Sequence, residues 1–267
     1  MKEVKSISSI QNPLIKKIAQ LQEKSRERKK TGLFVIEGNR EIDLAQKGGY
    51  PIAQLLISPE ISNFSVEDFI KRFPDSECIE ITRTVYQKMA YRESTEGVLA
   101  VAQNRSQALE TIDFTSDNPL ILVAEAPEKP GNIGALMRTA DAAGLDAVLI
   151  ANPKTDLYNP NIIRSSVGTI FTLQIGLGST EEIISFLKRR KISIRCAALS
   201  ASKSYVDANF GGALALVVGT ESMGLSDEWL ENSDENLIIP MQGEIDSMNV
   251  SVSAAILIFE AVRQRGI

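Results

Sequence analysis

The chain has 267 residues, of which 43% are hydrophobic and 24% charged, a composition typical of a globular protein with its own apolar core. It contains no histidine, which excludes Ser-His-Asp and Cys-His catalysis, histidine-ligated zinc and imidazole as a proton acceptor. No apolar run approaches the roughly 18 residues of a membrane span, and the polar N-terminus is typical of neither a signal peptide nor an anchor. Cys78 and Cys196 lie inside apolar runs, which predicts small buried side chains rather than a disulfide or a metal site. We therefore expect a cytoplasmic protein of about two domains, with no membrane partner.

Charge is distributed unevenly along the chain. The net charge is −5, yet residues 1–40 carry ten Lys or Arg and four Glu, so this segment is +6 and the other 227 residues sum to −11. A segregated basic segment favours binding of a polyphosphate, because each contact releases condensed counterions. A solvated, charged helix face explains the same pattern, and charge alone leaves both interpretations open.

In the first half of the chain, short apolar runs alternate with segments of helical periodicity. Apolar residues spaced three to four apart predict an amphipathic helix from Asn12 to Lys30 with its cationic face outward. Beyond it we expect strands at 33–38, 52–58, 78–82 and 97–103, and helices at 39–47, 66–72 and 84–91. This alternation predicts a small α/β domain over residues 1–105. A stretch rich in Ser, Thr, Asp, Asn and Pro predicts a linker over 106–119.

The second half, residues 120–267, has the pattern of a doubly wound, mostly parallel sheet. We expect strands at 120–125, 147–151, 169–175, 193–200, 213–219 and 236–241. Helices are expected at 132–143, 160–166, 180–191, 226–231 and 250–265. In such a sheet, ligands bind beyond the carboxyl ends of the strands.

The first candidate loop is Glu125–Gly144 (EAPEKPGNIGALMRTADAAG), which places Asn132 at the start of a helix. At 100° per residue, Arg138 falls about 140° from the core-facing Ile133, where its guanidinium is available to a phosphate or a polarised oxygen. An N-cap role for Asn132 and an ion pair between Arg138 and Asp141 explain the same residues without a ligand. The loop matches neither GxGxxG nor GxxxxGK[ST], which argues against dinucleotide binding and P-loop hydrolysis.

Two further loops also follow strands. In Leu216–Leu225 (LVVGTESMGL), Gly219 allows a flat ligand to approach the backbone, and Glu221 adds a carboxylate. A plain strand-to-helix turn, with Glu221 favoured by the helix dipole, is the alternative. The third loop, 238–251 (IIPMQGEIDSMNVS), holds Ser247 and Asn249, which would serve equally well as N-caps of the final helix.

The final helix is itself informative. From Val250 to Val262 it is apolar nearly all round, interrupted only by Ser251, Ser253 and Glu260. Such a helix must be covered on two sides. We expect the sheet on one side and a second subunit on the other.

Taken in order, the motifs PGNIGALMRTADAAG, VVGTESMGLS and IPMQGEIDSMNVSVSAAI closely resemble those of the SpoU/TrmH family. This family comprises SPOUT-class RNA ribose 2′-O-methyltransferases that use S-adenosylmethionine, and the resemblance covers Leu120 to Arg265. The first half resembles the family's N-terminal substrate-binding domain through NPLIKKIAQL and LFVIEGNREI. One position departs from the pattern: Met248 stands where the family usually has Leu between Ser and Asn. Because this exchange nearly conserves volume, we expect a backbone contact there to survive.

The resemblance implies an α/β fold with a deep trefoil knot over about 217–250, and a homodimer through the C-terminal domain with the site at the subunit interface. It implies cofactor contacts at Val218, Gly219, Thr220, Ile239, Pro240 and Met248. It implies motif roles in catalysis for Asn132, Arg138, Glu221, Ser247 and Asn249. The candidate RNA contacts of the first domain are Lys16, Lys17, Arg26, Arg28, Lys29 and Lys30. No metal is implied.

The implied reaction is an in-line displacement in which a ribose 2′-oxygen attacks the methyl group of a sulfonium, so the protein mainly supplies alignment and exclusion of water. A guanidinium pKa above about 12 makes Arg138 a poor base, and we expect it to stabilise the developing alkoxide. Ribosomal RNA is the expected substrate, and transfer RNA is the alternative. A non-catalytic RNA-binding or ribosome-assembly protein and a nucleotide-dependent oxidoreductase are alternatives of other classes. The missing glycine fingerprint argues against the oxidoreductase.

Overall fold

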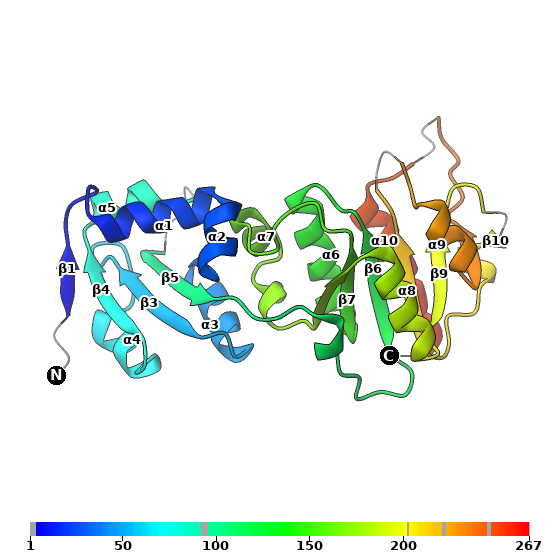
Figure 1. Cartoon of the computed structure of the whole chain (residues 1–267), viewed down its shortest axis with the longest axis horizontal. Helices are drawn as coiled ribbons and strands as arrows, with labels where there is room; N and C mark the ends of the chain where they lie inside the picture. The colour runs from blue at the N-terminus through cyan, green and yellow to red at the C-terminus, as the bar shows by residue number, and fades with distance from the viewer. Residues whose placement is uncertain (1–3, 92–95, 202, 221–222, 245–246, 267) are drawn as a thin grey trace. The chain divides into compact units, whose positions relative to one another are not determined.

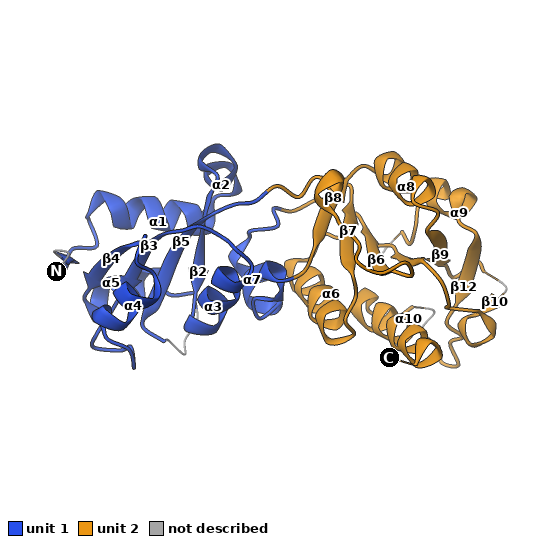
Figure 2. Cartoon of the chain, turned by 90° about the horizontal axis from the view of Figure 1, so that it is seen from below, with its two compact units in different colours: residues 1–105, 156–172 blue, residues 106–155, 173–267 orange. Residues whose placement is uncertain are grey.

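The structure, a computed structural model, describes residues 4–91, 96–201, 203–220, 223–244 and 247–266. The chain divides into two compact units, here called unit 1 (residues 1–105 and 156–172) and unit 2 (residues 106–155 and 173–267), which Figure 2 shows in different colours. Within the described residues, no helix is both long and apolar enough to cross a membrane.

Unit 1 is built on a mixed sheet of five strands in the order β1-β4-β3-β5-β2 (Figure 1). The strands are β1 (Lys5–Ile7), β2 (Leu33–Glu37), β3 (Ile52–Ile57), β4 (Glu77–Ile81) and β5 (Val98–Gln103). The helices are α1 (Pro13–Glu23), α2 (Ser25–Thr31), α3 (Asn39–Lys47), α4 (Val66–Arg72), α5 (Arg83–Met89) and α7 (Pro160–Ser165). β5 pairs antiparallel with β2 and β3, whereas β4 pairs parallel with β1 and β3. The buried apolar faces of α1 and α5 pack on one side of this sheet.

The predicted amphipathic helix ends earlier than expected. Its apolar face, Ile15, Ile18 and Leu21, is buried as predicted, but Lys24 is extended and the chain restarts as α2. The break lets Arg28 of α2 donate from Nη1 to the carbonyl oxygens of Leu21, at 2.6 Å, and Gln22, at 2.9 Å. These carbonyls lie in the last turn of α1, where no further turn of that helix supplies an N–H partner.

Residues 156–172 pack within unit 1. The Nε of Arg28 donates to Asp156, and both side chains are almost fully buried. The ring of Phe34 on β2 stacks on Tyr158, with centroids 4.2 Å apart, and on Phe171 at 5.9 Å. Aromatic stacking and a buried ion pair therefore join this segment to β2 and α2.

The strand predicted at 169–175 is wrong for its first part. Residues Thr169–Phe171 form a short 3-10 helix, and β8 begins only at Ile175. Val167 and Gly168 have φ values of 54° and 82°, so the chain turns sharply after α7. The apolar residues that resemble a strand are instead buried in unit 1. β1 was also not expected from the sequence.

Unit 2 contains a parallel sheet in the order β10-β12-β9-β11-β6-β7-β8, and each of its pairings is parallel. The strands are β6 (Leu120–Glu125), β7 (Ala147–Ala151), β8 (Ile175–Gly178), β9 (Ser193–Ala197), β10 (Lys203–Ser204), β11 (Leu214–Val218) and β12 (Glu235–Ile238). Helices α8 (Thr180–Arg189) and α9 (Asp227–Asn232) cover one face, and α6 (Pro130–Ala142) and α10 (Val250–Arg265) cover the other (Figure 2). The predicted doubly wound parallel sheet is confirmed.

The segment predicted as a linker contributes to a core. Leu109 and Ile112 are buried against residues of unit 2 such as Ile121 and Phe186. The division into functional domains at 1–105, 106–119 and 120–267 stays a prediction, as does the trefoil knot. Cys78 and Cys196 are buried, as predicted.

Candidate functional site

A cavity of about 440 Å³ lies beyond the carboxyl ends of β9, β11 and β12. We call it the main cavity. Parallel pairing sets Ala197 of β9 beside Leu237 of β12, so the loops that follow these strands emerge at the same edge. The described lining comprises Ala197, Ala198, Leu199, Ser200, Val218, Gly219, Thr220, Met223, Gly224, Leu225, Leu230, Leu237, Ile239, Met241, Ser247, Met248, Val250 and Ser253.

Most positions implied as cofactor contacts line this cavity. They are Val218, Gly219, Thr220, Ile239 and Met248, and Ser247 joins them. Pro240 is exposed and is not among the lining residues. Glu221 lies outside the described residues. None of the described lining side chains is ionised, so a ligand here would contact apolar groups, hydroxyls and the backbone.

Gly219 is required by the chain's own packing. A Cβ at this position would lie 2.2 Å from the carbonyl carbon and oxygen of Gly224. The backbones of Thr220 and Gly224 also exchange two hydrogen bonds, of 2.9 and 3.1 Å. The sequence predicted that Gly219 lets a ligand approach the backbone. In the structure, the absence of a side chain at Gly219 leaves room for the backbone of Gly224, where the loop folds back.

A second cavity of about 210 Å³ shares Gly219, Thr220 and Val250 with the main cavity. Its other lining residues are Ala124, Pro127, Glu128, Lys129, Asn132 and Leu136. Here the first and third motifs meet, because Asn249 Nδ2 donates to Asn132 Oδ1 at 3.2 Å. Asn249 also caps α10, since its Oδ1 accepts from the Ser251 N–H at 3.0 Å. The side chain of Asn249 therefore both caps α10 and contacts Asn132 of the first motif.

Arg138 lies on the exposed side of α6 and lines neither cavity. Within the described residues it makes no ion pair, so the alternative of pairing with Asp141 is not realised. The structure therefore brings together Asn132, Ser247 and Asn249 around the adjoining cavities, whereas Arg138 is presented to solvent. Groups of acidic or cysteine side chains that could hold a metal are absent from the described ranges.

Glu125, which the sequence analysis did not single out, fixes the loops at the end of β6. It is buried, and it accepts hydrogen bonds from the Ser226 N–H at 2.9 Å and the Ser226 hydroxyl at 2.7 Å. The Thr180 hydroxyl donates to the same carboxylate at 3.2 Å. The only signal in the sequence is an acidic residue that ends an apolar strand, LILVAE.

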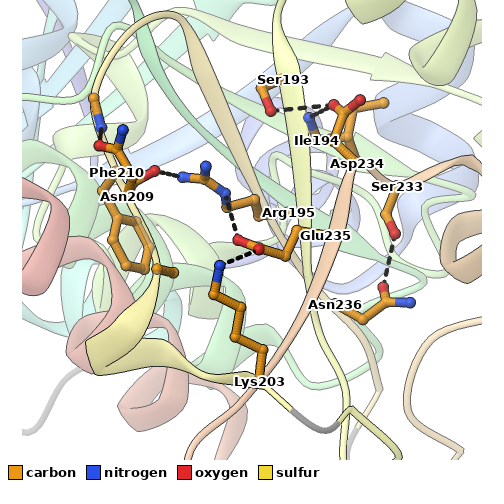
Figure 3. Close-up of polar contacts among 12 residues, drawn as sticks. Ser193, Ile194, Arg195, Lys203, Asn209, Phe210, Ser233, Asp234, Glu235 and Asn236 are labelled. Atoms are coloured by element: carbon orange, nitrogen blue, oxygen red, sulfur yellow. Dashed lines mark hydrogen bonds and ion pairs between the residues drawn. The ribbon is translucent and has the colours of Figure 1, made fainter.

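A second polar cluster, formed by Arg195, Lys203 and Glu235, connects the strands next to the main cavity (Figure 3). Glu235 on β12 lies between two cations, Lys203 Nζ at 2.5 Å and Arg195 Nε at 3.3 Å. These contacts connect β9, β12 and β10, which flank the segment that carries Leu199 and Ser200. The Ala198 N–H also donates to the Leu237 carbonyl at 2.9 Å. The cluster therefore fixes one side of the cavity without lining it.

The predicted cationic residues of unit 1 do not all face solvent. Lys16, Lys17, Arg26, Lys29 and Lys30 are exposed. Arg28 is 4% exposed and its donors are used by Asp156 and by the end of α1, so the expectation of a solvent-facing cation at this position is wrong.

Comparisons with known proteins cover nearly the whole chain. A model described as the SpoU rRNA Methylase family matches residues 119–259, and an MRM3-like substrate binding domain matches residues 12–100. The chain is similar to the 23S rRNA (guanosine(2553)-2′-O)-methyltransferase RlmP of Bacillus subtilis, at 29% identity over 96% of this chain and 98% of that protein.

Solved structures give the same result. A crystal structure of an RNA 2′-O ribose methyltransferase is 38% identical, with a TM-score of 0.85 over 98% of this chain and all of that one. The SpoU methyltransferase AviRb from Streptomyces viridochromogenes, in complex with the cofactor AdoMet (S-adenosylmethionine), is 27% identical, with a TM-score of 0.86 over 96% of this chain and 98% of that one.

Proposed function

Because the chain belongs to the SpoU rRNA methylase family, we propose that its main cavity binds S-adenosylmethionine and that it methylates a ribose 2′-hydroxyl of ribosomal RNA. The chain is an S-adenosylmethionine-dependent RNA 2′-O-methyltransferase. The observation that carries the proposal is the meeting of three motifs, distant in sequence, at two adjoining cavities.

The main cavity suits this cofactor in size and chemistry. Its volume of about 440 Å³ lies within the roughly 300–1,000 Å³ of small-molecule sites, which are mostly apolar with a few placed polar groups. Val218, Ile239 and Met248 supply apolar surface, and Thr220 and Ser247 supply hydroxyls. Those residues would hold the cofactor, which when bound supplies a methyl group on an electrophilic sulfonium.

The smaller cavity is the place we assign to the acceptor ribose. It adjoins the main cavity through Gly219, Thr220 and Val250 and carries Asn132, whose amide is held by Asn249. An amide fixed in this way orients a hydroxyl and helps to exclude water, which is most of what a displacement at a sulfonium requires from the protein.

Arg138 completes the site from a second copy of the chain. It is exposed, unpaired within the described residues, and carried by α6, which packs beside α10 (Figure 2). Val252 and Phe259 of α10 are both 48% exposed, which supports a homodimer through these helices. A guanidinium there would stabilise the developing alkoxide rather than accept its proton.

Unit 1 is proposed to bind the RNA. Its exposed cations on α1 and α2 supply contacts to phosphates, and its match to a substrate binding domain supports this role. Similarity to a 23S rRNA methyltransferase favours ribosomal RNA over transfer RNA. A ribosomal RNA substrate also supports a location in the cytoplasm.

The proposal is tested by calorimetric titration with S-adenosylmethionine, followed by transfer of its labelled methyl group to unmodified ribosomal RNA. We expect 2′-O-methylated nucleosides after digestion and mass spectrometry. If the cofactor does not bind, or if the label appears only on bases, the proposed activity is wrong.

The Arg138→Lys variant tests the role of the guanidinium. We expect single-turnover methylation to slow by about 100-fold, because a compact ammonium does not reproduce the planar fork that meets the alkoxide. Cofactor affinity should stay unchanged. Arg189→Lys, on the exposed side of α8, serves as the matched control. An undiminished single-turnover rate for Arg138→Lys would contradict the assignment.

A further inference from the structure

Unit 1 carries an exposed aromatic ring paired with a guanidinium. Tyr91, which follows α5, is 55% exposed, and the guanidinium carbon of Arg164 on α7 lies 5.6 Å from its ring centroid. Arg164 is exposed as well. The two residues come from segments far apart in sequence, and both belong to unit 1. The pair therefore results from the packing of α7 onto this unit.

Hydrogen bonds hold the backbone of Tyr91 and the guanidinium of Arg164. The Tyr91 N–H donates to Glu37 Oε2 at 2.9 Å, and Arg164 Nη2 donates to Asn161 Oδ1 at 3.2 Å. Arg164 makes no ion pair within the described ranges, and the Glu37 carboxylate that lines the same hollow is engaged by the Tyr91 N–H. The guanidinium and the backbone that carries the ring are therefore fixed before a ligand binds, which lowers the entropy lost on binding.

A second guanidinium of unit 1 also lies beside aromatic rings but is not available to a ligand. We call this group, Arg72 with Phe64, Phe69 and Phe73, the Arg72 cluster. Arg72 also lies over exposed Phe64, with the guanidinium carbon 5.9 Å from the ring centroid. Its guanidinium, however, is bonded to Asp43 and Asn39 and is covered by further phenylalanine rings. Its charge and its donors are therefore already used within the protein.

The hollow beside the Tyr91–Arg164 pair is too small for a base. It is lined by Gln22, Val35, Glu37, Pro160 and Ile163 together with the pair, and has a volume of about 20 Å³. A site of that size holds about one water molecule. A planar ligand must therefore lie on the exposed faces of the pair.

We propose that Tyr91 and Arg164 form a stacking platform for one unpaired nucleobase of the substrate RNA. Every base has a π-face, and aromatic rings and guanidinium planes bind it with little dependence on sequence. In an A-form duplex these faces are buried in the stack, so the platform selects looped or single-stranded RNA. The inference rests on the proposed RNA substrate but assigns a contact separate from the cofactor cavity.

The test measures binding of full-length protein to a fluorescein-labelled, 12-nucleotide single-stranded RNA by anisotropy, with a duplex of the same strand for comparison. Tyr91→Ala should weaken single-strand binding by about tenfold, whereas Tyr91→Phe and Tyr91→Trp should remain within about twofold of the wild type. Arg164→Lys keeps the charge and loses the plane, so it should weaken binding without lowering the dependence of affinity on salt.

The matched control is Phe64→Ala, which removes an exposed aromatic ring from the Arg72 cluster. It should leave RNA affinity unchanged. The platform is refuted if Tyr91→Ala or Arg164→Lys binds RNA as tightly as the wild type. It is also refuted if Phe64→Ala weakens RNA binding as much as Tyr91→Ala does. Duplex binding that falls in parallel with single-strand binding would also refute it.

Cofactor titration separates this inference from the proposed function. Tyr91→Ala should bind S-adenosylmethionine normally and raise KM for RNA far more than it lowers kcat. If the wild type binds no cofactor, the methyltransferase proposal fails, while the anisotropy measurements still decide on the platform.

Discussion

Gly219 lines both cavities and also determines how the loop around it closes. Its Cα hydrogen occupies space that any Cβ would share with the backbone of Gly224. The loop closure that results sets the edge where the main and the second cavity meet. A glycine in a predicted binding loop therefore shapes the site through the chain around it.

The Gly219→Ala variant follows directly from this contact. We expect it to lose measurable S-adenosylmethionine binding and to lower the free energy of unfolding by about 1–3 kcal/mol, because the backbone must shift to admit the methyl group. Titration calorimetry and urea unfolding measure the two effects. At Gly131 a Cβ would meet nothing within 4 Å, so Gly131→Ala is the control. Normal cofactor binding by Gly219→Ala would contradict the steric argument.

Cys196 gives a pH dependence. Burial, with the nearby Glu125 carboxylate second, raises the pKa of its thiol from 9.0 to about 12. Between these values the unfolded chain loses this proton and the folded chain keeps it, so the free energy of unfolding should fall as pH rises from about 9 to 12.

Urea unfolding of the wild type and of Cys196→Ala at pH 8 and pH 10.5 measures this effect. We expect the wild type to lose about 1–2 kcal/mol more than the variant over that interval. Iodoacetamide should modify Cys196 at pH 9 only after denaturation. Equal pH slopes for the two proteins, or rapid alkylation of the folded wild type, would argue against a buried neutral thiol.

At the scale of elements, the junction between α1 and α2 determines where the cations of unit 1 point. The periodicity of residues 12–30 predicts one helix, yet a second helix begins after Lys24 and turns Arg28 toward the carbonyls that end α1. The same turn brings Arg28 onto Asp156, which lies more than a hundred residues away in sequence. Local pattern predicts the helical character but not which cation is buried.

The Asp156→Ala variant leaves Arg28 buried without its carboxylate. We expect a loss of about 3–5 kcal/mol in the free energy of unfolding, measured by urea denaturation, because one charge of a buried pair stays uncompensated. Replacing both partners, as Arg28→Met with Asp156→Leu, should cost much less. Asp75→Ala, at an exposed aspartate of the same unit, should stay within about 0.5 kcal/mol of the wild type. If Asp156→Ala lowers the free energy of unfolding no more than Asp75→Ala does, the Arg28–Asp156 pair does not contribute to stability.

At the scale of the whole molecule, we propose that a second chain completes the site. Asn132, Ser247 and Asn249 gather around the cavities, whereas Arg138 is exposed and lines neither cavity. Val252 and Phe259 lie seven residues apart on α10, and hence on one face of it, and are both half-exposed. These observations together favour a dimer in which each copy supplies Arg138 to the other.

Phe259→Asp tests that assembly. A charge at the centre of an apolar contact should convert the dimer to a monomer in sedimentation experiments and abolish methyl transfer, with little change in the melting temperature. Val206→Asp alters a similarly exposed apolar residue outside α10 and should leave the dimer intact. A wild-type monomer with full activity would overturn the proposed arrangement.

Sequence alone determined the local features of this protein. Hydrophobic periodicity identified most strands and helices of both units, and the order of three glycine- and amide-bearing motifs indicated the family and the loops around Gly219, Ile239 and Met248. These signals are local because side-chain period and turn chemistry depend on near neighbours. The first part of the strand expected at 169–175 failed for the same reason, since Ile170 and Phe171 are buried in unit 1, whereas Ile175 begins β8.

Only the tertiary structure decided how distant segments meet. Parallel register brings the loops after β9, β11 and β12 to one edge. The packing of α10 beside α6 brings Asn249 to Asn132, 117 positions away in sequence. The tertiary structure also buries Arg28 against Asp156, bonds the buried Glu125 to Ser226, and sets Arg164 over the ring of Tyr91. These contacts depend on sheet register and on chain turns such as that at Val167 and Gly168, and no pattern within a short stretch of sequence encodes either of them.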